Sequence, residues 1–145
     1  MGAPERIVGE RFADVRGVLQ CVNGCDLAAV RRFYVLHHPD TAVVRGWNGH
    51  RAEQKWFVCV RGSFTLALVA VDDFEHPSRD LVPQVYRLSA ETSEAVHVPG
   101  GYANAFKALE PDSVMLVFSD KTLAEAAQDS WRFPADWWMD WRRAE

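Results

Sequence analysis

The sequence contains no apolar run near the ~20 residues that a membrane-spanning helix needs. Its first ten residues, MGAPERIVGE, also lack the hydrophobic core of a signal peptide. We therefore expect a cytoplasmic protein with no membrane partner. An excess of positive charge is missing too, because the formal net charge is −4. Nothing thus draws the whole chain to nucleic acid, and an anionic ligand must be held by a local group of arginines and lysines.

Cysteine is scarce, with three residues in the 145. Cys21 and Cys25 have C-x3-C spacing, but no second Cys/His pair follows at zinc spacing. Cys59 lies in an apolar strand pattern, which is typical of a buried thiol. Low-complexity segments, repeats and Gly/Ser-rich linkers are absent as well, so we expect a single domain over residues 1–145.

Short segments of β type make up most of the chain, at near-regular spacing. In KWFVCVRGSFTLALVAVDD, two apolar runs flank Arg61-Gly62-Ser63, which predicts a hairpin. Other strand-like segments are RIVGERFADVRGVLQCVNG, RRFYVLHH, TAVVRGW, PQVYRLSA, EAVHVPGGYANAFKAL and SVMLVFSD. The pattern predicts an all-β barrel or jelly roll.

The end of the chain differs from the rest. KTLAEAAQDSW is rich in Ala and predicts a short helix, with Asp120 or Thr122 as its N-cap. WRFPADWWMDWRRAE then carries four of the six tryptophans, and Pro134 interrupts any continuous helix. Such a cluster must be covered. Two interpretations are open: it closes one end of the barrel, or it is buried in a subunit interface.

The stretch VRGWNGHRAEQKWFVCVRGSF carries Asn48, His50 and Lys55 in an order that resembles the first motif of the cupins. PGGYANAF resembles the second cupin motif, with Asn104 where many members carry a histidine. The resemblance implies a double-stranded β-helix, a jelly-roll barrel that forms one cupin domain over 1–145. Asparagine is a poor ligand for borderline metals, and a protonated lysine is none. We expect no metal and no other cofactor.

The closer resemblance is to the dTDP-4-dehydrorhamnose 3,5-epimerases and the related sugar 3,4-ketoisomerases of the RmlC-like and WxcM-like cupins. It rests on six elements in the family's order, FADVRG, VVRGWNGH, KWFVCVRGSFTLALVAVD, VYRLSAE, VHVPGGYANAF and KALEPDS. It implies a metal-independent epimerase or ketoisomerase that moves a proton on a dTDP-linked 4-keto-6-deoxyhexose.

The resemblance also implies roles for three cationic residues. Lys55 matches a lysine that faces the ketone, where a positive charge stabilises the developing enolate oxygen. Arg45 matches an arginine expected at the diphosphate or sugar, whose paired oxygens suit a guanidinium. Arg16 matches an arginine that helps to hold the nucleotide, often from the neighbouring subunit. A homodimer is therefore expected, with N-terminal strands exchanged or added to the partner's sheet.

Two departures from the 3,5-epimerases concern the acid and the base. Asn48 takes the place of the histidine base, and it cannot accept a proton at neutral pH. The strand VMLVFSD has no match for the catalytic tyrosine. The 3,4-ketoisomerases fit better, because they carry an H-x-H pair and also lack that tyrosine. His50 matches the second histidine of the pair and is the expected base, while Asn48 can orient a hydroxyl or the ketone.

Further candidates remain open. His37 or His38 can replace the missing base if its strand lines the barrel, and Tyr102 can replace the missing acid. Trp47 either stacks on the ligand or belongs to the core. The alternative to an enzyme is a catalytically inactive cupin that binds a sugar nucleotide as a partner protein in deoxysugar biosynthesis. The enzyme is favoured if His50 and Lys55 share a cavity with a second acid.

Overall fold

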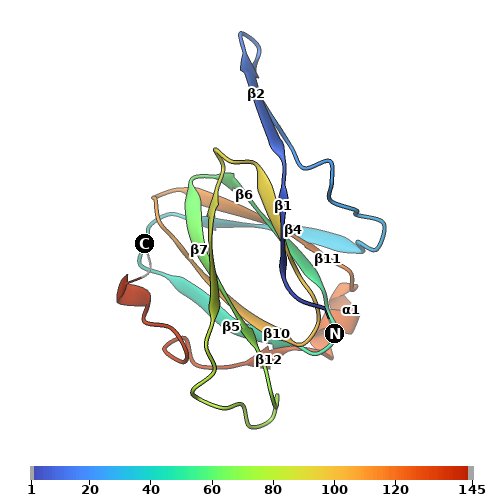
Figure 1. Cartoon of the computed structure of the whole chain (residues 1–145), viewed down its shortest axis with the longest axis vertical. Coiled ribbons are helices and arrows are strands. Elements are labelled where there is room, and N and C mark those ends of the chain that lie inside the picture. Colours follow the sequence, from blue (N-terminus) through green and yellow to red (C-terminus); the bar gives the residue numbers. More distant parts are fainter. Residues whose placement is uncertain (1, 144–145) are drawn as a thin grey trace.

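The computed structural model of the chain describes residues 2–143, in which two five-stranded antiparallel sheets face each other (Figure 1). In spatial order, the first sheet consists of β1 (Glu5–Val8), β9 (Glu94–Val98), β6 (Lys55–Arg61), β11 (Ser113–Ser119) and β4 (Arg32–His38). The second consists of β12 (Trp131–Arg132), β5 (Val44–His50), β10 (Tyr102–Ala108), β7 (Ser63–Ala70) and β8 (Gln84–Ser89). β2 (Glu10–Asp14) and β3 (Gly17–Cys21) form a separate hairpin that projects from the barrel.

The core lies between the two sheets. Alternation along β7 points Phe64, Leu66 and Leu68 into the barrel, where each is fully buried. Ala67 and Val69 lie on the opposite face and belong to a second apolar cluster outside the barrel. The prediction of an all-β barrel is therefore correct for the described residues.

The predicted hairpin at Arg61-Gly62-Ser63 is wrong. β6 pairs with β9 and β11, whereas β7 pairs with β10 and β8, so the chain changes sheets between the two strands. Gly62 makes this change with a φ of 73°, a conformation that favours glycine. Turn residues mark where a strand ends, but they do not determine the sheet in which the next strand pairs.

The C-terminal helix is confirmed as α1 (Leu123–Ala127), with Thr122 as its N-cap. Thr122 accepts from the backbone N–H of Glu125, and the Glu125 side chain accepts from the backbone N–H of Thr122, which makes a capping box. No helix among residues 2–143 is long and apolar enough to cross a membrane.

The tryptophan-rich segment does not close an end of the barrel, contrary to the first interpretation. It lies along the outer face of the second sheet and ends in a 3-10 turn, Trp141–Arg143 (Figure 1). There Trp138 packs edge-on against Trp47, with ring centroids 5.2 Å apart. Ala103 and Ala105 of β10 are also buried in this cluster. The small outer side chains of β10 and β7 therefore leave room for the indole rings.

Candidate active site

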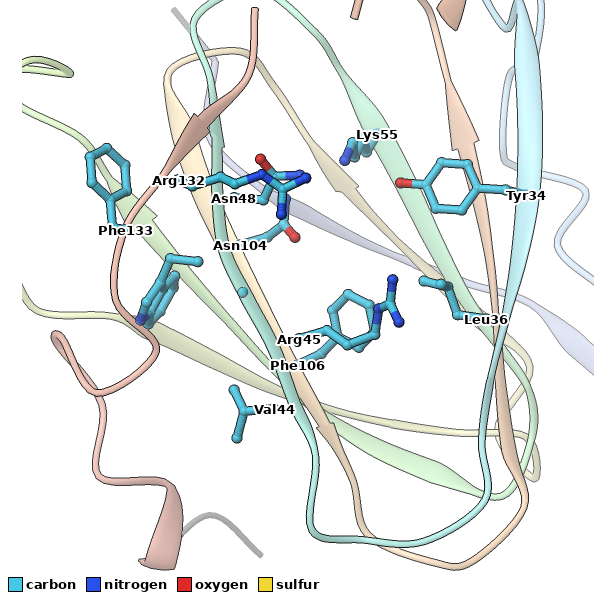
Figure 2. Close-up of a pocket in the computed structure, with 12 residues that line it drawn as sticks. Tyr34, Leu36, Val44, Arg45, Asn48, Lys55, Asn104, Phe106, Arg132 and Phe133 are labelled. Carbon is cyan, nitrogen blue, oxygen red and sulfur yellow. The ribbon is translucent and has the colours of Figure 1, made fainter. Parts of the chain in front are cut away.

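A cavity of about 450 Å³ opens between the two sheets (Figure 2). β4 and β6 contribute one wall, and β5, β10 and β12 contribute the other. Figure 2 shows Arg132, Asn48 and Asn104 pointing into this space, with Tyr34 facing them from β4. The lining residues are Tyr34, Leu36, Val44, Arg45, Gly46, Trp47, Asn48, Lys55, Asn104, Phe106, Arg132 and Phe133.

An irregularity in β5 brings Arg45 and Asn48 to the cavity together. Residues three apart on a regular strand point to opposite faces. Here Asn104 of β10 pairs with Asn48 while Ala105 pairs with Gly46, so Trp47 is an extra residue in β5. The bulge resets the alternation and places both side chains on the inner wall. The strand predicted over 41–47 is found over Val44–His50.

The cavity is cationic. Its lining includes Arg45, Lys55 and Arg132 but no aspartate or glutamate. Lys55 is only 5% exposed, and its ammonium nitrogen lies 5.8 Å from the ring centroid of Tyr34. Within residues 2–143, none of the three cations forms an ion pair. Lys55 is buried, whereas Arg45 and Arg132 are exposed at the cavity wall. Unpaired cations gathered in this way favour an anionic ligand.

Two amides occupy the middle of the inner wall. Asn48 and Asn104 are directly opposite each other on β5 and β10. The Asn48 side-chain oxygen accepts a hydrogen bond of 3.3 Å from the Ser130 hydroxyl. An amide pair of this kind can donate to and accept from sugar hydroxyls, but it cannot take up a proton at neutral pH. No histidine, cysteine or carboxylate lines the cavity, and no group of these residues among 2–143 suits a metal ion.

His50 follows Asn48 by two residues and faces the same side of β5, one side-chain position further along the strand. It is 5% exposed and is not among the residues that line the cavity. Its Nδ1 lies 2.7 Å from the carbonyl oxygen of Asp129, while Nε2 is buried and has no hydrogen-bond partner. Burial and the neighbouring charge of Lys55 lower the pKa of His50. The neutral imidazole is therefore favoured at pH 7.

The turn after His50 is held in place by a carboxylate from the end of the chain. The Asp129 side chain accepts from the backbone N–H groups of Arg51, Ala52 and Glu53, at 2.7 to 2.9 Å. Burial raises the pKa of Asp129, but these three hydrogen bonds outweigh it and hold the pKa below its usual value. Asp129 thus fixes both the turn and, through its carbonyl, the imidazole of His50.

The other predicted site residues do not direct their functional groups into the cavity, although Trp47 is among its lining residues. Trp47 packs on the outer sheet face and donates from Nε1 to the Trp137 carbonyl, so its ring belongs to the core. Tyr102 points inward but is packed in the barrel core and does not line the cavity. His37 points outward from β4, 3.1 Å from the Asp112 carboxylate, because alternation directs its neighbours inward. Arg16 pairs with Asp14 at the tip of the projecting hairpin.

Of the two histidines considered as replacement bases, His38 points into the barrel. Its ring packs between Phe64 and Phe106, and neither ring nitrogen has a hydrogen-bond partner. Burial lowers the pKa of His38. His38 is not among the cavity residues, so it does not replace the missing base in this arrangement.

Two polar cavity residues, Tyr34 and Arg132, were not identified from the sequence. Tyr34 lies in RRFYVLHH, where period-2 alternation places it on the same face as Leu36 and could have identified it. Arg132 reaches the cavity because β12 pairs with β5 and sets it opposite Asn48. Nothing in the local sequence signals that pairing.

The chain matches the family model described as FdtA: WxcM-like, C-terminal, over residues 7–133. No curated protein sequence matches it. Among solved structures, a mutant of the 3,4-ketoisomerase QdtA from Thermoanaerobacterium thermosaccharolyticum, in complex with TDP-4-keto-6-deoxyglucose, is similar at 18% identity and a TM-score of 0.70. The match covers 92% of this chain and 89% of that one.

Two epimerases have the same fold. The rmlC epimerase of Mycobacterium tuberculosis matches at 19% identity and a TM-score of 0.76, over 96% of this chain and 74% of that one. ChmJ, a 3'-monoepimerase from Streptomyces bikiniensis in complex with dTDP-quinovose, matches at 18% identity and a TM-score of 0.68. That match covers 86% of this chain and 67% of the other. At this identity the likeness shows the fold, which is that of the RmlC-like cupins as predicted.

Proposed function

Since this chain belongs to the FdtA family, WxcM-like, C-terminal, we propose that it is an isomerase that moves a proton on a nucleotide-linked 4-keto-6-deoxyhexose. The observation that carries the proposal is the cavity, which gathers Arg45, Lys55 and Arg132 with no carboxylate in a chain of net charge −4. A sugar nucleotide brings a diphosphate to match the arginines and a ketone to match the lysine.

His50 is the proposed base. Its Nδ1 faces a carbonyl oxygen, so in the neutral ring the proton sits on Nδ1 and the lone pair of Nε2 is free. Nε2 takes the proton from the sugar carbon next to the ketone, which gives an enolate. The ammonium of Lys55 stabilises the oxygen of that enolate, and Asn48 and Asn104 orient the hydroxyls. In a ketoisomerase, the hydroxyl proton on C3 also passes to the enolate oxygen on C4, and His50 gives its proton to C4, so that the ketone moves to C3. In an exchange reaction, His50 exchanges its proton with solvent and returns one to C3, and the ketone at C4 forms again.

Tyr34 is the proposed second acid. Its hydroxyl belongs to β4 and faces the wall formed by β5, β10 and β12 (Figure 2). A proton donor on β4 approaches the sugar from the side opposite Asn48 and Asn104, and inversion at a carbon requires a donor on that opposite side. The cavity thus combines Lys55 with a second acid, which favours an enzyme. His50 lies next to the cavity lining and not in it, and Asn48 takes the place of the family's histidine, and both of these features favour the inactive binding protein.

The test is proton exchange in deuterated buffer, with TDP-4-keto-6-deoxyglucose as the probe and NMR detection at sugar C3 and C5. We expect deuterium at C3, where His50 acts as a single base. Exchange at both carbons would require a second base that the cavity does not contain. Saturable binding without any exchange would overturn the enzyme and leave the sugar-nucleotide-binding protein.

Replacement of Arg132 by methionine is expected to weaken the binding of TDP about tenfold, the equivalent of about 1.4 kcal/mol. Methionine keeps the apolar stem of the side chain but removes the guanidinium from the cavity wall. Calorimetric titration with TDP measures the effect. Arg142→Met is the matched control, because that arginine pairs with Asp140 on the surface and should leave affinity unchanged. Equal affinity in both variants would remove Arg132 from the binding site.

A homodimer is proposed as the assembled form. The β2–β3 hairpin exposes Phe12 and Leu19, which are 52% and 61% accessible, and an isolated hairpin is marginally stable in water. β4 is an edge strand of its sheet, with Phe33 and Val35 exposed on its outer face. An open apolar edge of this kind is usually covered. A hairpin from a second copy supplies strands and apolar side chains for it, and carries Arg16 with it.

Sedimentation velocity tests this assembly. We expect the unmodified chain to sediment as a dimer and the double variant Phe12→Ser, Leu19→Ser to shift toward the monomer. Val82→Ser is the control, since Val82 is 84% exposed in the loop before β8 and lies on neither surface. A monomer at all concentrations for the unmodified chain would contradict the proposal.

A further inference from the structure

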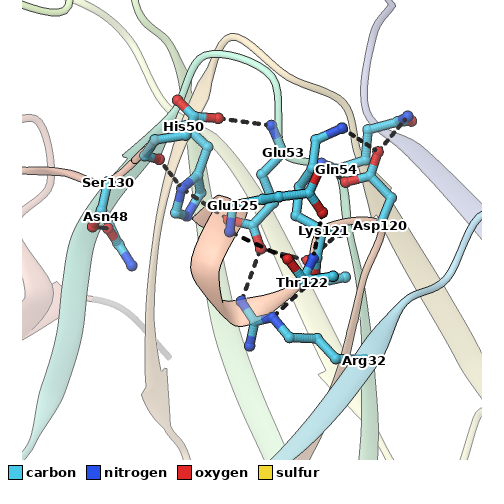
Figure 3. Close-up of polar contacts among 12 residues, drawn as sticks. Arg32, Asn48, His50, Glu53, Gln54, Asp120, Lys121, Thr122, Glu125 and Ser130 are labelled. Carbon is cyan, nitrogen blue, oxygen red and sulfur yellow. Dashed lines mark hydrogen bonds and ion pairs between the residues drawn. The ribbon is translucent and has the colours of Figure 1, made fainter. Parts of the chain in front are cut away.

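A buried carboxylate lies beside the imidazole of His50. The Glu53 side chain has no exposed surface. Its Oε2 accepts from the Arg32 guanidinium at 3.0 Å and from the Ser119 hydroxyl at 2.5 Å (Figure 3). Arg32 belongs to β4 and Ser119 to β11, so two strands of the opposite sheet hold this carboxylate in one orientation.

The second oxygen of Glu53 is directed at the histidine. Oε1 lies 3.1 Å from Nδ1 of His50, and the Asp129 carbonyl oxygen lies 2.7 Å from the same nitrogen. Both oxygens can only accept when Glu53 is ionised, so Nδ1 carries the proton. The N–H points at the Asp129 carbonyl, which leaves Oε1 close to the ring but without a hydrogen bond of its own. Nε2 on the other side of the ring is then unprotonated.

An unpaired carboxylate oxygen in the interior is costly unless a positive charge compensates for it. Arg32 supplies that charge at Oε2, whereas Oε1 has only the neutral imidazole. If Nε2 takes up a proton, the ring becomes a cation 3.1 Å from Oε1. The carboxylate therefore interacts more strongly with His50 after proton abstraction than before it. Differential stabilisation of this kind favours the reaction.

We propose, on the premise of the proposed function, that Glu53 is a positioning residue for the reaction, which fixes the Nδ1–H form of His50 and provides the counter-charge for its protonated form. Glu53 differs from the residues proposed to contact the ligand, because it does not line the cavity. It acts on the substrate only through His50.

The charged groups around His50 come from four parts of the chain. Lys55 of β6 opposes protonation of the ring, while Glu53 in the turn and Asp129 after α1 favour it. Arg32 of β4 stands behind Glu53 and offsets part of its charge. In the free protein, burial and the Lys55 charge outweigh the effects of Glu53 and Asp129, so the pKa of His50 is lowered and the neutral ring is favoured. Removing the Glu53 charge must lower that pKa further.

The experiment compares Glu53→Gln with the unmodified full-length protein, both labelled with ¹⁵N at the imidazole rings. Gln keeps the size and the ability to bond Arg32 and Ser119, but it carries no charge. We expect NMR to show the Nδ1–H form of His50 in the unmodified protein, and its pKa to fall in the variant because the Glu53 charge is lost. C3 exchange should slow several-fold, and the acidic limb of its pH profile should move to lower pH by the same amount.

Glu94→Gln is the matched control, because Glu94 is also a buried carboxylate paired with an arginine, Arg6, at 2.5 Å. Loss of that pair should change stability without moving the pKa of His50. An Nε2–H form in the unmodified protein would overturn the proposal without any variant, even if Glu53→Gln fails to fold. An unchanged pKa in a folded Glu53→Gln variant would overturn it too. A shifted pKa with no exchange in the unmodified protein would overturn the catalytic role together with the proposed function, and leave the tautomer assignment alone.

Discussion

Replacement of His50 by asparagine is expected to slow deuterium exchange at sugar C3 by about 10²- to 10⁴-fold, the range typical for loss of a general base. His50 follows the cavity residue Asn48 by two positions on β5, and its Nε2 is unpartnered in the interior. The asparagine side chain is small enough for the site and has no basic lone pair at neutral pH. Binding of TDP should change little, because His50 does not line the cavity that holds the three cations.

The control for this variant is His37→Asn. That histidine is 13 residues earlier, half exposed on the outer face of β4, and paired with Asp112. The His37→Asn variant should catalyse deuterium exchange at sugar C3 at the rate of the unmodified protein. If His50→Asn retains the unmodified rate, His50 is not the base, and the family's proton chemistry would need another group in this chain. Deuterium at both C3 and C5 in the variant would lead to the same conclusion.

Replacement of Lys55 by methionine is expected to slow C3 exchange by about 10²- to 10³-fold, as for removal of one donor to a developing oxyanion. Methionine fills the space of the lysine stem but offers no charge to the enolate oxygen. The loss of activity should not be accompanied by a loss of thermal stability. Lys55 is 5% exposed and forms no ion pair within residues 2–143, so replacing its charge with an apolar side chain should leave Tm unchanged or raise it.

Lys107→Met is the control, since Lys107 points outward from β10 and donates to the Trp141 carbonyl at 3.3 Å. Exchange should be unaffected there. A Lys55→Met variant that is less stable and exchanges normally would make Lys55 a structural residue. A variant that is as stable as the unmodified protein but inactive separates function from folding at this position, because a charge held for a ligand is a cost in its absence.

Several features followed from the sequence alone. Alternating apolar residues identified the strands, and the two N-cap candidates, Asp120 and Thr122, included the residue that starts α1, which is Thr122. The motif order around Asn48, His50 and Lys55 indicated a cupin, and the net charge of −4 required a local cationic cluster for any anionic ligand. Arg45 and Lys55 do line one cavity. These features depend on residues close together in the chain, where period and spacing carry the information.

Only the tertiary structure decided which groups meet. The bulge at Trp47 turns Arg45 and Asn48 to the same wall, against simple alternation. Arg132 enters the cavity through the pairing of β12 with β5, and Asp129 reaches His50 from 79 residues away. The outward direction of His37 likewise depends on which face of β4 is covered. Strand partners, register and the burial of one face are set by contacts distant in sequence, so a local pattern cannot specify them.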